Sequence, residues 1–454
     1  MEKTMNFKQE ILTILLVRIC FVSSQDITQL REYGCQWHGG SSATLACYCQ
    51  NGAEMIVRSQ SIPAFDTTTI EINGCKLVKF EDNSISDMRN LRSITLNNIE
   101  SLIFDSRSMN WYGYKENHGH IEERFDMSVP SLKISITQSN VSLISSHTFT
   151  GRINEITFDT TTIDKISPLA FANLLQSETI AIRNSVIKDI EVQSFKKFST
   201  EYLELNGVSA NFIPSRTFSN ITVYQNFTID NCNFNTVRSS GFTIYNPQVF
   251  QVTNTNISHL NGEAFSIVSR GIVIFRNNVF GEVNDGAFQG ITLQRDTQVN
   301  DISFIFESNS LSKLTRYSLG TTDFKVQYRN IYIGEQCDCT DIDHKIIETS
   351  YYSEIMCLHD EEYMTVRDFK SNMCSIVTNY YITLIIVCVV IILVIVVVSI
   401  LVMYYKFVYR KNKYGGPKQG KNGQLSLIVP DGRTYRETEL HVIVEKTDLL
   451  TTDL

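Results

Sequence analysis

The sequence predicts an α/β-type repeat solenoid built from short parallel strands, followed by one membrane-spanning helix. Three observations lead to this prediction: an apolar pattern that recurs every 22 to 24 residues, an uninterrupted apolar segment near the C-terminus, and cysteine clusters at both ends of the repeats. The chain has 454 residues, of which 43% are hydrophobic, and its formal net charge is −8. This acidic balance argues against a broad nucleic-acid-binding surface, because such a surface needs an excess of basic side chains to neutralise phosphates.

The repeat is defined by five apolar positions. Counted from a first apolar residue at position zero, the others follow at +2, +7, +10 and +15, as in Ile156, Phe158, Ile163, Ile166 and Phe171. Further copies start at Ile134, Ile180, Leu203, Phe227, Phe250, Val273 and Phe304, and weaker ones at Ile70 (with Leu77 at +7) and Ile94. One coil cannot bury its apolar edge alone, whereas stacked coils share a continuous core. We therefore assign residues 70–336 to a solenoid.

The apolar segment near the C-terminus is long enough to cross a bilayer. Residues 382–403 carry no charge, and at about 1.5 Å per residue they span roughly 33 Å of helix. Tyrosines flank the segment on both sides, where amphipathic rings prefer the membrane interface. We assign residues 382–405 to the membrane helix.

The two ends of the chain predict its orientation. Residues 1–24 have the basic start, short apolar core and small residues before the cut that are typical of a secretory signal peptide. Lys406, Arg410 and Lys411 follow the membrane helix, so the positive-inside rule places residues 406–454 in the cytoplasm. The sequence thus predicts a single-pass type I protein of the plasma membrane with an extracellular portion.

The offsets of the apolar positions resemble the extracellular leucine-rich-repeat family, whose pattern LxxLxLxxNxLxxL is followed by a Phe. The resemblance covers roughly residues 35–374, although Ile, Val or Phe often replaces Leu, and the Asn at +5 survives only as Asn278 and Asn309. It implies a leucine-rich-repeat horseshoe. The alternative fold is a parallel β-helix, which is also a coil of short strands.

Two sets of four cysteines flank the repeats, and disulfides are available outside the cell. The spacing of Cys337, Cys339, Cys357 and Cys374 resembles the cysteine-rich C-terminal flank of this family, which implies the pairs Cys337–Cys357 and Cys339–Cys374. We assign residues 337–374 to this cap.

The N-terminal cysteines belong to a cap over residues 25–69, with the last of them entering the first repeat. Four cysteines allow three pairings, among which we expect Cys35–Cys49 and Cys47–Cys75. The remaining extracellular cysteine, Cys232, sits at +5 of its repeat. We expect it to be a buried thiol rather than the partner in an intermolecular disulfide.

No nucleophile, phosphate-binding or metal motif is convincing, so the sequence predicts a protein that is not an enzyme and needs no cofactor. Candidate ligand-binding residues are of two kinds. Trp111 and Tyr112 open a long insertion between two repeats, and they either anchor a ligand or pack back onto the repeats. The outward positions of the repeat strands contribute Tyr202, Ile272, Ile274 and Ile305, the isoleucines being either a binding patch or covered by the loop at residues 294–301.

Two groups of modification and trafficking signals complete the sequence. N-glycosylation sequons occur at Asn140, Asn220, Asn226 and Asn256, all in the predicted extracellular portion. In the tail, Glu445, Leu449 and Leu450 resemble an acidic dileucine signal read by clathrin adaptors, which would add endosomal cycling. Thr452 and Leu454 resemble a C-terminal ligand of PDZ scaffolds.

Together these features predict a non-catalytic cell-surface recognition or adhesion receptor. Its partner would be an extracellular protein ligand or a protein on another cell, and its tail would bind an adaptor or scaffold. The alternative is a ligand-binding co-receptor that signals through a partner transmembrane protein.

Replacing Leu449 and Leu450 by Ala is expected to raise the amount of protein at the cell surface, because the internalisation signal is lost. Surface biotinylation and antibody uptake measure this change. Thr452→Ala is the matched control, since it breaks only the PDZ pattern, and unchanged internalisation of the Leu variant would count against the signal.

Overall fold

The structure is a computed structural model. It describes residues 33–39, 43–49, 52–62, 67–112, 131–175, 177–294, 303–320, 324–339 and 344–413. The chain divides into two units, Met1–Thr378 and Asn379–Leu454. The predicted signal peptide and the tail motifs at Glu445, Leu449, Leu450, Thr452 and Leu454 lie outside the described residues.

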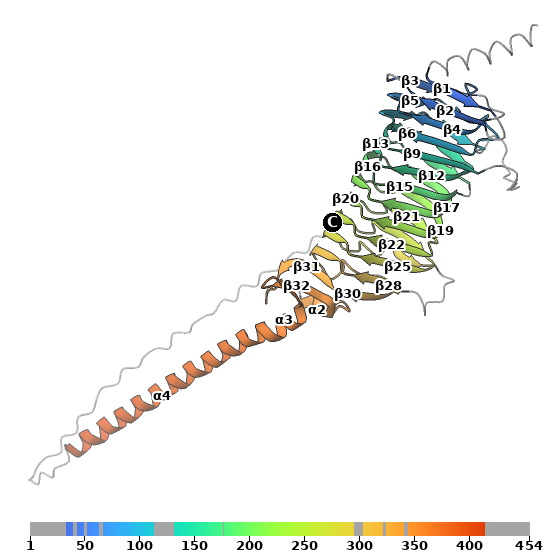
Figure 1. Cartoon of the computed structure of the whole chain (residues 1–454). Helices are drawn as coiled ribbons and strands as arrows, with labels where there is room; N and C mark the ends of the chain where they lie inside the picture. Colours follow the sequence, from blue (N-terminus) through green and yellow to red (C-terminus); the bar gives the residue numbers. More distant parts are fainter. Residues whose placement is uncertain are drawn as a thin grey trace, which may run out of the picture. The chain divides into compact units, whose positions relative to one another are not determined.

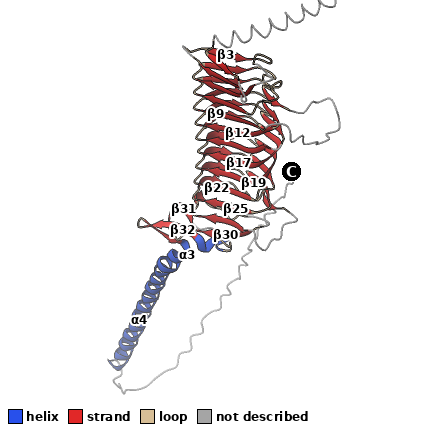
Figure 2. Ribbon diagram, turned by 45° about the vertical axis from the view of Figure 1, so that its right-hand side comes forward, coloured by secondary structure: helices blue, strands red, loops and turns tan. Residues whose placement is uncertain are grey.

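The first unit is a β-solenoid of about 11 turns (Figures 1 and 2). Its strands form a 19-stranded and a 14-stranded sheet over the part of the chain that is described. In the coil that starts at Ile156, β12 (Ile153–Asp159) is followed by β13 (Thr162–Ile166) and β14 (Phe171–Leu174). Each coil therefore offers up to three short strands that stack on the equivalent strands of its neighbours.

The larger sheet contains the first and third strands of the coils. The first strands are β2 (Ala43–Tyr48), β4 (Thr67–Asn73), β6 (Ser93–Asn97), β9 (Leu132–Thr137), β12, β15 (Ser177–Arg183), β17 (Phe195–Asn206), β19 (Phe218–Asp230), β22 (Val249–Thr253), β25 (Ile272–Arg276), β28 (Ser303–Glu307) and β30 (Lys325–Arg329). The third strands are β8 (Met109–Trp111), β11 (Phe149–Gly151), β14, β21 (Phe242–Tyr245), β24 (Phe265–Ser269) and β27 (Ile291–Leu293), while β17 and β19 run through both places.

The smaller sheet contains the second strands. These are β3 (Glu54–Val57), β5 (Leu77–Phe80), β7 (Ser101–Phe104), β10 (Asn140–Ile144), β13, β16 (Val186–Ile190), β18 (Ser209–Ile213), β20 (Asn233–Val237), β23 (Asn256–Leu260), β26 (Val279–Val283), β29 (Ser310–Lys313), β31 (Ile331–Gln336), β32 (Ile355–His359) and β33 (Glu362–Thr365). Helices in the solenoid unit are confined, over the described ranges, to its C-terminal end. The unit is thus mostly strand, with far less helix than an α/β-type solenoid would have.

The register confirms the repeat period. Ile156 pairs with Ile134 on one side and Ile180 on the other, so position zero of each repeat stacks on position zero of the next. The first two repeats differ at one place: Val78 at +8 is buried, whereas Leu77 at +7, expected to point inward, is half-buried. The reason is that β5 and β7 alternate regularly, and a bulge between Val141 and Leu143 shifts the later coils to +7.

Residues in the left-handed conformation turn the corners of the coils. At +4 the backbone has positive φ in coil after coil, and the series is rich in Asn and Gly: Gly74, Asn98, Gln138, Thr160, Asn184, Gly207, Asn231, Asn254, Asn277 and Ser308. Asn tolerates this conformation because its short polar side chain can hydrogen-bond locally, and Gly because it has no Cβ. The apolar pattern alone did not reveal this second column of the repeat.

A stack of phenylalanine rings fills the core behind the third strands. The ring of Phe195 lies 4.3 Å from that of Phe171 and 4.5 Å from that of Phe218, and both pairs are nearly parallel. The stack runs through Phe80, Phe104, Phe149, Phe171, Phe195, Phe218, Phe242 and Phe265. Each ring is buried and packs against the coils above and below, so the stack couples neighbouring repeats.

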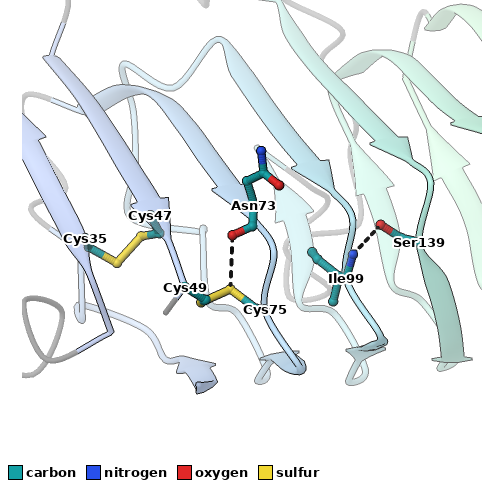
Figure 3. The surroundings of a disulfide bond; sticks show 7 residues. All are labelled: Cys35, Cys47, Cys49, Asn73, Cys75, Ile99 and Ser139. Carbon is teal, nitrogen blue, oxygen red and sulfur yellow. Dashed lines mark hydrogen bonds between the residues drawn. A yellow bond between two sulfur atoms is a disulfide. The ribbon is translucent and has the colours of Figure 1, made fainter. Parts of the chain in front are cut away.

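A column of polar side chains at +5 satisfies the backbone inside the corner. Asn278 accepts a hydrogen bond from the Thr255 N–H at 2.9 Å and donates one to the Val252 carbonyl at 2.8 Å. Asn309 repeats this arrangement one coil later, accepting from the Asn278 N–H at 3.0 Å. Hydroxyls take the accepting role elsewhere, as when Ser139 accepts from the Ile99 N–H (Figure 3).

Disulfides close both ends of the solenoid. At the C-terminal end Cys337 pairs with Cys357 and Cys339 with Cys374, as the resemblance implied. This end also contains α2 (His344–Ile347), η2 (Tyr352–Glu354), α3 (Val366–Phe369) and η3 (Lys370–Cys374).

The expected N-terminal pairing was wrong. The structure joins Cys35 to Cys47 and Cys49 to Cys75 (Figure 3). The reason is that β1 (Cys35–His38) runs antiparallel to β2 and places Cys35 directly opposite Cys47. Cys49, just past the end of β2, then reaches Cys75 at +5 of the first repeat.

The second unit contains most of α4 (Ser375–Lys413), a helix of 39 residues. Its segment Tyr380–Arg410 is long and apolar enough to cross a membrane, and its side chains are not covered by other parts of the protein. The predicted span, residues 382–405, lies inside this segment.

Replacing Phe195 by Ala is expected to cost about 3–5 kcal/mol, because the cavity would interrupt the ring stack between two coils. A lowered unfolding midpoint of the purified full-length protein measures the loss. Val192→Ala in the same coil is the control, since Val192 is exposed and its truncation leaves no cavity. Equal losses for both variants would contradict the role of the stack.

Candidate functional site

The candidate site is the outer face of the first strands, here called the recognition face. It consists of the outward side chains at −1, +1 and +3 of the repeats on the strands from β9 to β30. Because the strands are parallel and in register, equivalent side chains form rows across neighbouring coils, about 4.8 Å apart. Such a continuous surface is the part of a solenoid best suited to contact a protein.

The N-terminal half of the recognition face is polar and its charges are paired. Lys133 forms an ion pair with Glu155 at 2.8 Å, and the hydrogen bond from Glu155 raises the pKa of Lys133. Arg183 makes a bidentate pair with Glu204, which likewise raises the pKa of that guanidinium. Exposed pairs of this kind contribute little to stability. Their effect is to leave this half of the face hydrophilic, with most of its charge neutralised locally.

The C-terminal half carries an apolar cluster, here called the isoleucine patch: Ile272, Ile274 and Ile305. Ile272 and Ile274 are alternate residues of β25, and Ile305 on β28 is the registered neighbour of Ile274. All three are half-buried. The structure therefore brings these predicted residues together. Most of the adjacent loop, residues 295–302, lies outside the described residues, so the alternative of a covering loop stays open.

A charged border limits the isoleucine patch on one side. Arg276 forms an ion pair with Glu307 at 2.9 Å, and Arg329 approaches the other oxygen of Glu307 at 3.9 Å. Apolar residues ringed by paired charges are typical of interaction sites, because the apolar centre supplies affinity and the border supplies orientation.

Tyr202 lies elsewhere on the recognition face. It is 40% exposed, and its registered neighbours are Thr179 on β15 and Asn226 on β19. Two strands, β19 and β22, separate it from Ile272 on β25. Tyr202 is therefore not part of the isoleucine patch.

The structure contradicts the hypothesis that Trp111 is an exposed anchor. Its side chain is completely buried at the end of β8, and its Nε1–H donates to the Met88 carbonyl at 3.1 Å. The physical reason is strand alternation: Met109 and Trp111 both point inward, so Trp111 extends the core. Tyr112 is partly exposed, packs edge-on against Trp111 and donates to the Arg89 carbonyl. Residues 113–130, including His118 and His120, lie outside the described residues.

The four sequons differ in exposure. Asn220, Asn226 and Asn256 have exposed side chains, whereas Asn140 is half-buried and its Oδ1 is enclosed without a hydrogen-bond partner. Asn226 lies on the recognition face itself, at the −1 position of its repeat. A glycan there would stand between the polar half of the face and the isoleucine patch.

Sequence reasoning missed Tyr224. This residue is 46% exposed and precedes Asn226 by two residues on β19. It falls outside the −1, +1 and +3 positions because the register of β17 and β19 shifts between Thr200 and Tyr202. The available signal was an aromatic residue immediately upstream of a sequon.

Cys232 is a buried member of the +5 column. Its N–H donates to the Thr255 hydroxyl at 3.2 Å, and its thiol lies within 3.4 Å of the Leu205 carbonyl. Burial raises the pKa of this thiol to about 12. Among the residues whose structure is described, no group of three or more His, Cys, Asp and Glu side chains could hold a metal ion.

A scan against protein-family models gives no match for this chain, and a search of curated proteins gives no significant match.

Native Cys232 is expected to react with iodoacetamide at pH 8 at least about a hundredfold more slowly than the unfolded chain, because only the thiolate is reactive. The measurement uses a Cys388→Ser background, since Cys388 is the other free cysteine in the described residues. Cys232→Ser is the matched control, as Ser occupies the same column at Ser139 and Ser185. A covalent dimer on a non-reducing gel, lost in Cys232→Ser, would refute the buried thiol.

Proposed function

We propose that this protein is a non-catalytic cell-surface recognition or adhesion receptor. It binds an extracellular protein ligand, or a protein on another cell, through the recognition face of its solenoid. We further propose that the solenoid is a divergent member of the extracellular leucine-rich-repeat family. The observation that carries the proposal is the isoleucine patch, an apolar cluster with a paired charged border on an otherwise polar face.

Two features support the family assignment. The apolar spacing of the repeats matches the family pattern at zero, +2, +7, +10 and +15. Asn278 and Asn309 also bond the backbone at +5 in the manner expected of a ladder asparagine, and Ser, Thr and Cys take over this position in other coils. The departure is the number of strands outside the first row, which makes each coil strand-rich where the family's horseshoe allows helix.

The membrane arrangement follows from chemistry at both ends of α4. The solenoid precedes the apolar helix and is closed by four disulfides, which form in extracellular conditions. The basic residues after the helix favour a cytoplasmic tail. We therefore place the solenoid outside the plasma membrane, with the tail available to clathrin adaptors and PDZ scaffolds.

Ile274→Lys combined with Ile305→Lys is expected to reduce ligand binding or cell aggregation by at least about tenfold, since a buried contact of this kind carries more than 1.4 kcal/mol. The readout is aggregation of cells that express the full-length protein at matched surface levels. Thr157→Lys is the matched control, because Thr157 is a half-buried outward position in the polar half of the same face. Deletion of residues 406–454 should leave aggregation intact.

Two outcomes would redirect this proposal. Unchanged aggregation in the double isoleucine variant would remove the patch as the binding site. Failure of the wild-type protein to aggregate cells, together with co-purification of a second transmembrane protein, would favour the co-receptor alternative.

A further inference from the structure

The sequon at Asn226 lies next to two exposed tyrosines. Tyr202 on β17 is the registered neighbour of Asn226 on β19, in strands that lie side by side (Figure 1). Registered residues of parallel strands are about 4.8 Å apart and point to the same side of the sheet. The side chains of Tyr202 and Asn226 therefore project together from the recognition face.

Tyr224 lies on the other side of this pair along the chain. The register between β17 and β19 passes from Thr200 opposite Val223 to Tyr202 opposite Asn226, so Tyr224 and Gln225 together face a single residue of β17. This irregularity turns the Tyr224 ring outward. The Arg270 guanidinium donates to the Tyr224 carbonyl and holds the backbone at this point.

Neither ring has an aromatic partner among the described residues, in contrast to the stacked phenylalanines of the core. Beyond Asn226 the same row continues through Val249 to Ile272, both half-buried. Asn226 thus stands in a row of mostly apolar side chains whose outer surfaces are uncovered. Exposed apolar surface of this kind usually has an occupant.

We propose that Asn226 carries an N-glycan whose first sugars pack on Tyr202 and Tyr224. A pyranose ring has a face of C–H groups and a rim of hydroxyls, which suits a tyrosine ring with an apolar face and a polar edge. The occupant is therefore part of this chain and is attached where it binds. The glycan is a fixed element of the recognition face rather than a mobile appendage.

The modification requires a polyprenyl-pyrophosphate-linked oligosaccharide as donor. The Asn226 amide nitrogen forms a bond to the anomeric carbon of the first N-acetylglucosamine, and the bond from that carbon to the pyrophosphate oxygen breaks. The amide nitrogen loses one proton and the lipid pyrophosphate leaves. Thr228 completes the sequon, and its hydroxyl accepts a hydrogen bond from Gln251 in the folded chain.

Asn256 provides an internal comparison one coil away. Its side chain is exposed, but its registered neighbours are Asn233 and Val279, and its amide donates to the Asn233 side chain at 3.2 Å. The residue two positions before it is Asn254. A glycan at Asn256 thus has no tyrosine beside it in the register or upstream in the strand.

This inference reassigns Tyr202 from ligand binding to glycan packing. It does not depend on the proposed function, because the isoleucine patch lies on other strands and is tested with other residues. A glycan held at Asn226 would screen the middle of the recognition face and leave its two halves separately accessible.

The test uses full-length protein made in cells that attach high-mannose glycans, purified in detergent and digested under native conditions with an endoglycosidase that cuts between the first two sugars. Site-resolved mass spectrometry follows release at each sequon. We expect release at Asn226 to be roughly tenfold slower than at Asn256, and the Tyr202→Ala, Tyr224→Ala double variant to remove the difference at Asn226 only.

Thermal unfolding gives a second readout. The tyrosine double variant should lower the unfolding midpoint of the glycosylated protein and should have no effect when Asn226→Gln or Thr228→Ala has removed the sequon. Thr228→Ser is the matched control, because it keeps the sequon and the hydroxyl.

Four results would overturn the inference. They are an unmodified Asn226 in the wild-type protein, equal release at Asn226 and Asn256, and an equal fall in unfolding midpoint with and without the sequon. The fourth is loss of cell aggregation in Tyr202→Ala with glycan release unchanged, which would make a protein ligand the occupant.

Discussion

The structure depends on stacking in register. A single coil of 22 to 24 residues exposes the edges of its apolar side chains, and only an identical neighbour with matching positions can cover them. The parallel pairing of Ile134, Ile156 and Ile180 and the face-to-face rings of Phe171, Phe195 and Phe218 are two expressions of this requirement. Because each coil contacts chiefly the next, the two ends remain incomplete, and disulfides close them.

The same constraint decides which residues are free to vary. Inward positions accept Ile, Leu, Val or Phe, since any of them fills the shared core. The +5 position needs a hydrogen-bonding group aimed at the backbone, and an amide, a hydroxyl or the Cys232 thiol serves. Outward positions have no such duty, which is why the recognition face changes from paired charges near Lys133 and Arg183 to isoleucines on β25 and β28.

Register also turns distant sequence into local surface. Tyr202 and Asn226 are 24 residues apart in the chain and adjacent on the sheet. Ile274 and Ile305 are separated by a longer interval that includes a loop, yet they too are neighbours. Function in a solenoid of this kind is therefore distributed along rows that cross the strands, and a glycan in one row affects access to all of it.

The sequence by itself determined the repeat period, the inward positions and the apolar helix, because these follow from local periodicity and composition. Only the tertiary structure decided three other features. Trp111 is buried because strand alternation on β8 turns it inward, the N-terminal disulfides differ because the β1–β2 hairpin puts Cys35 opposite Cys47, and the coils are strand-rich because the second and third rows pair from coil to coil. Each of these depends on contacts between segments that are not adjacent in the chain, and a pattern read along one chain does not contain them.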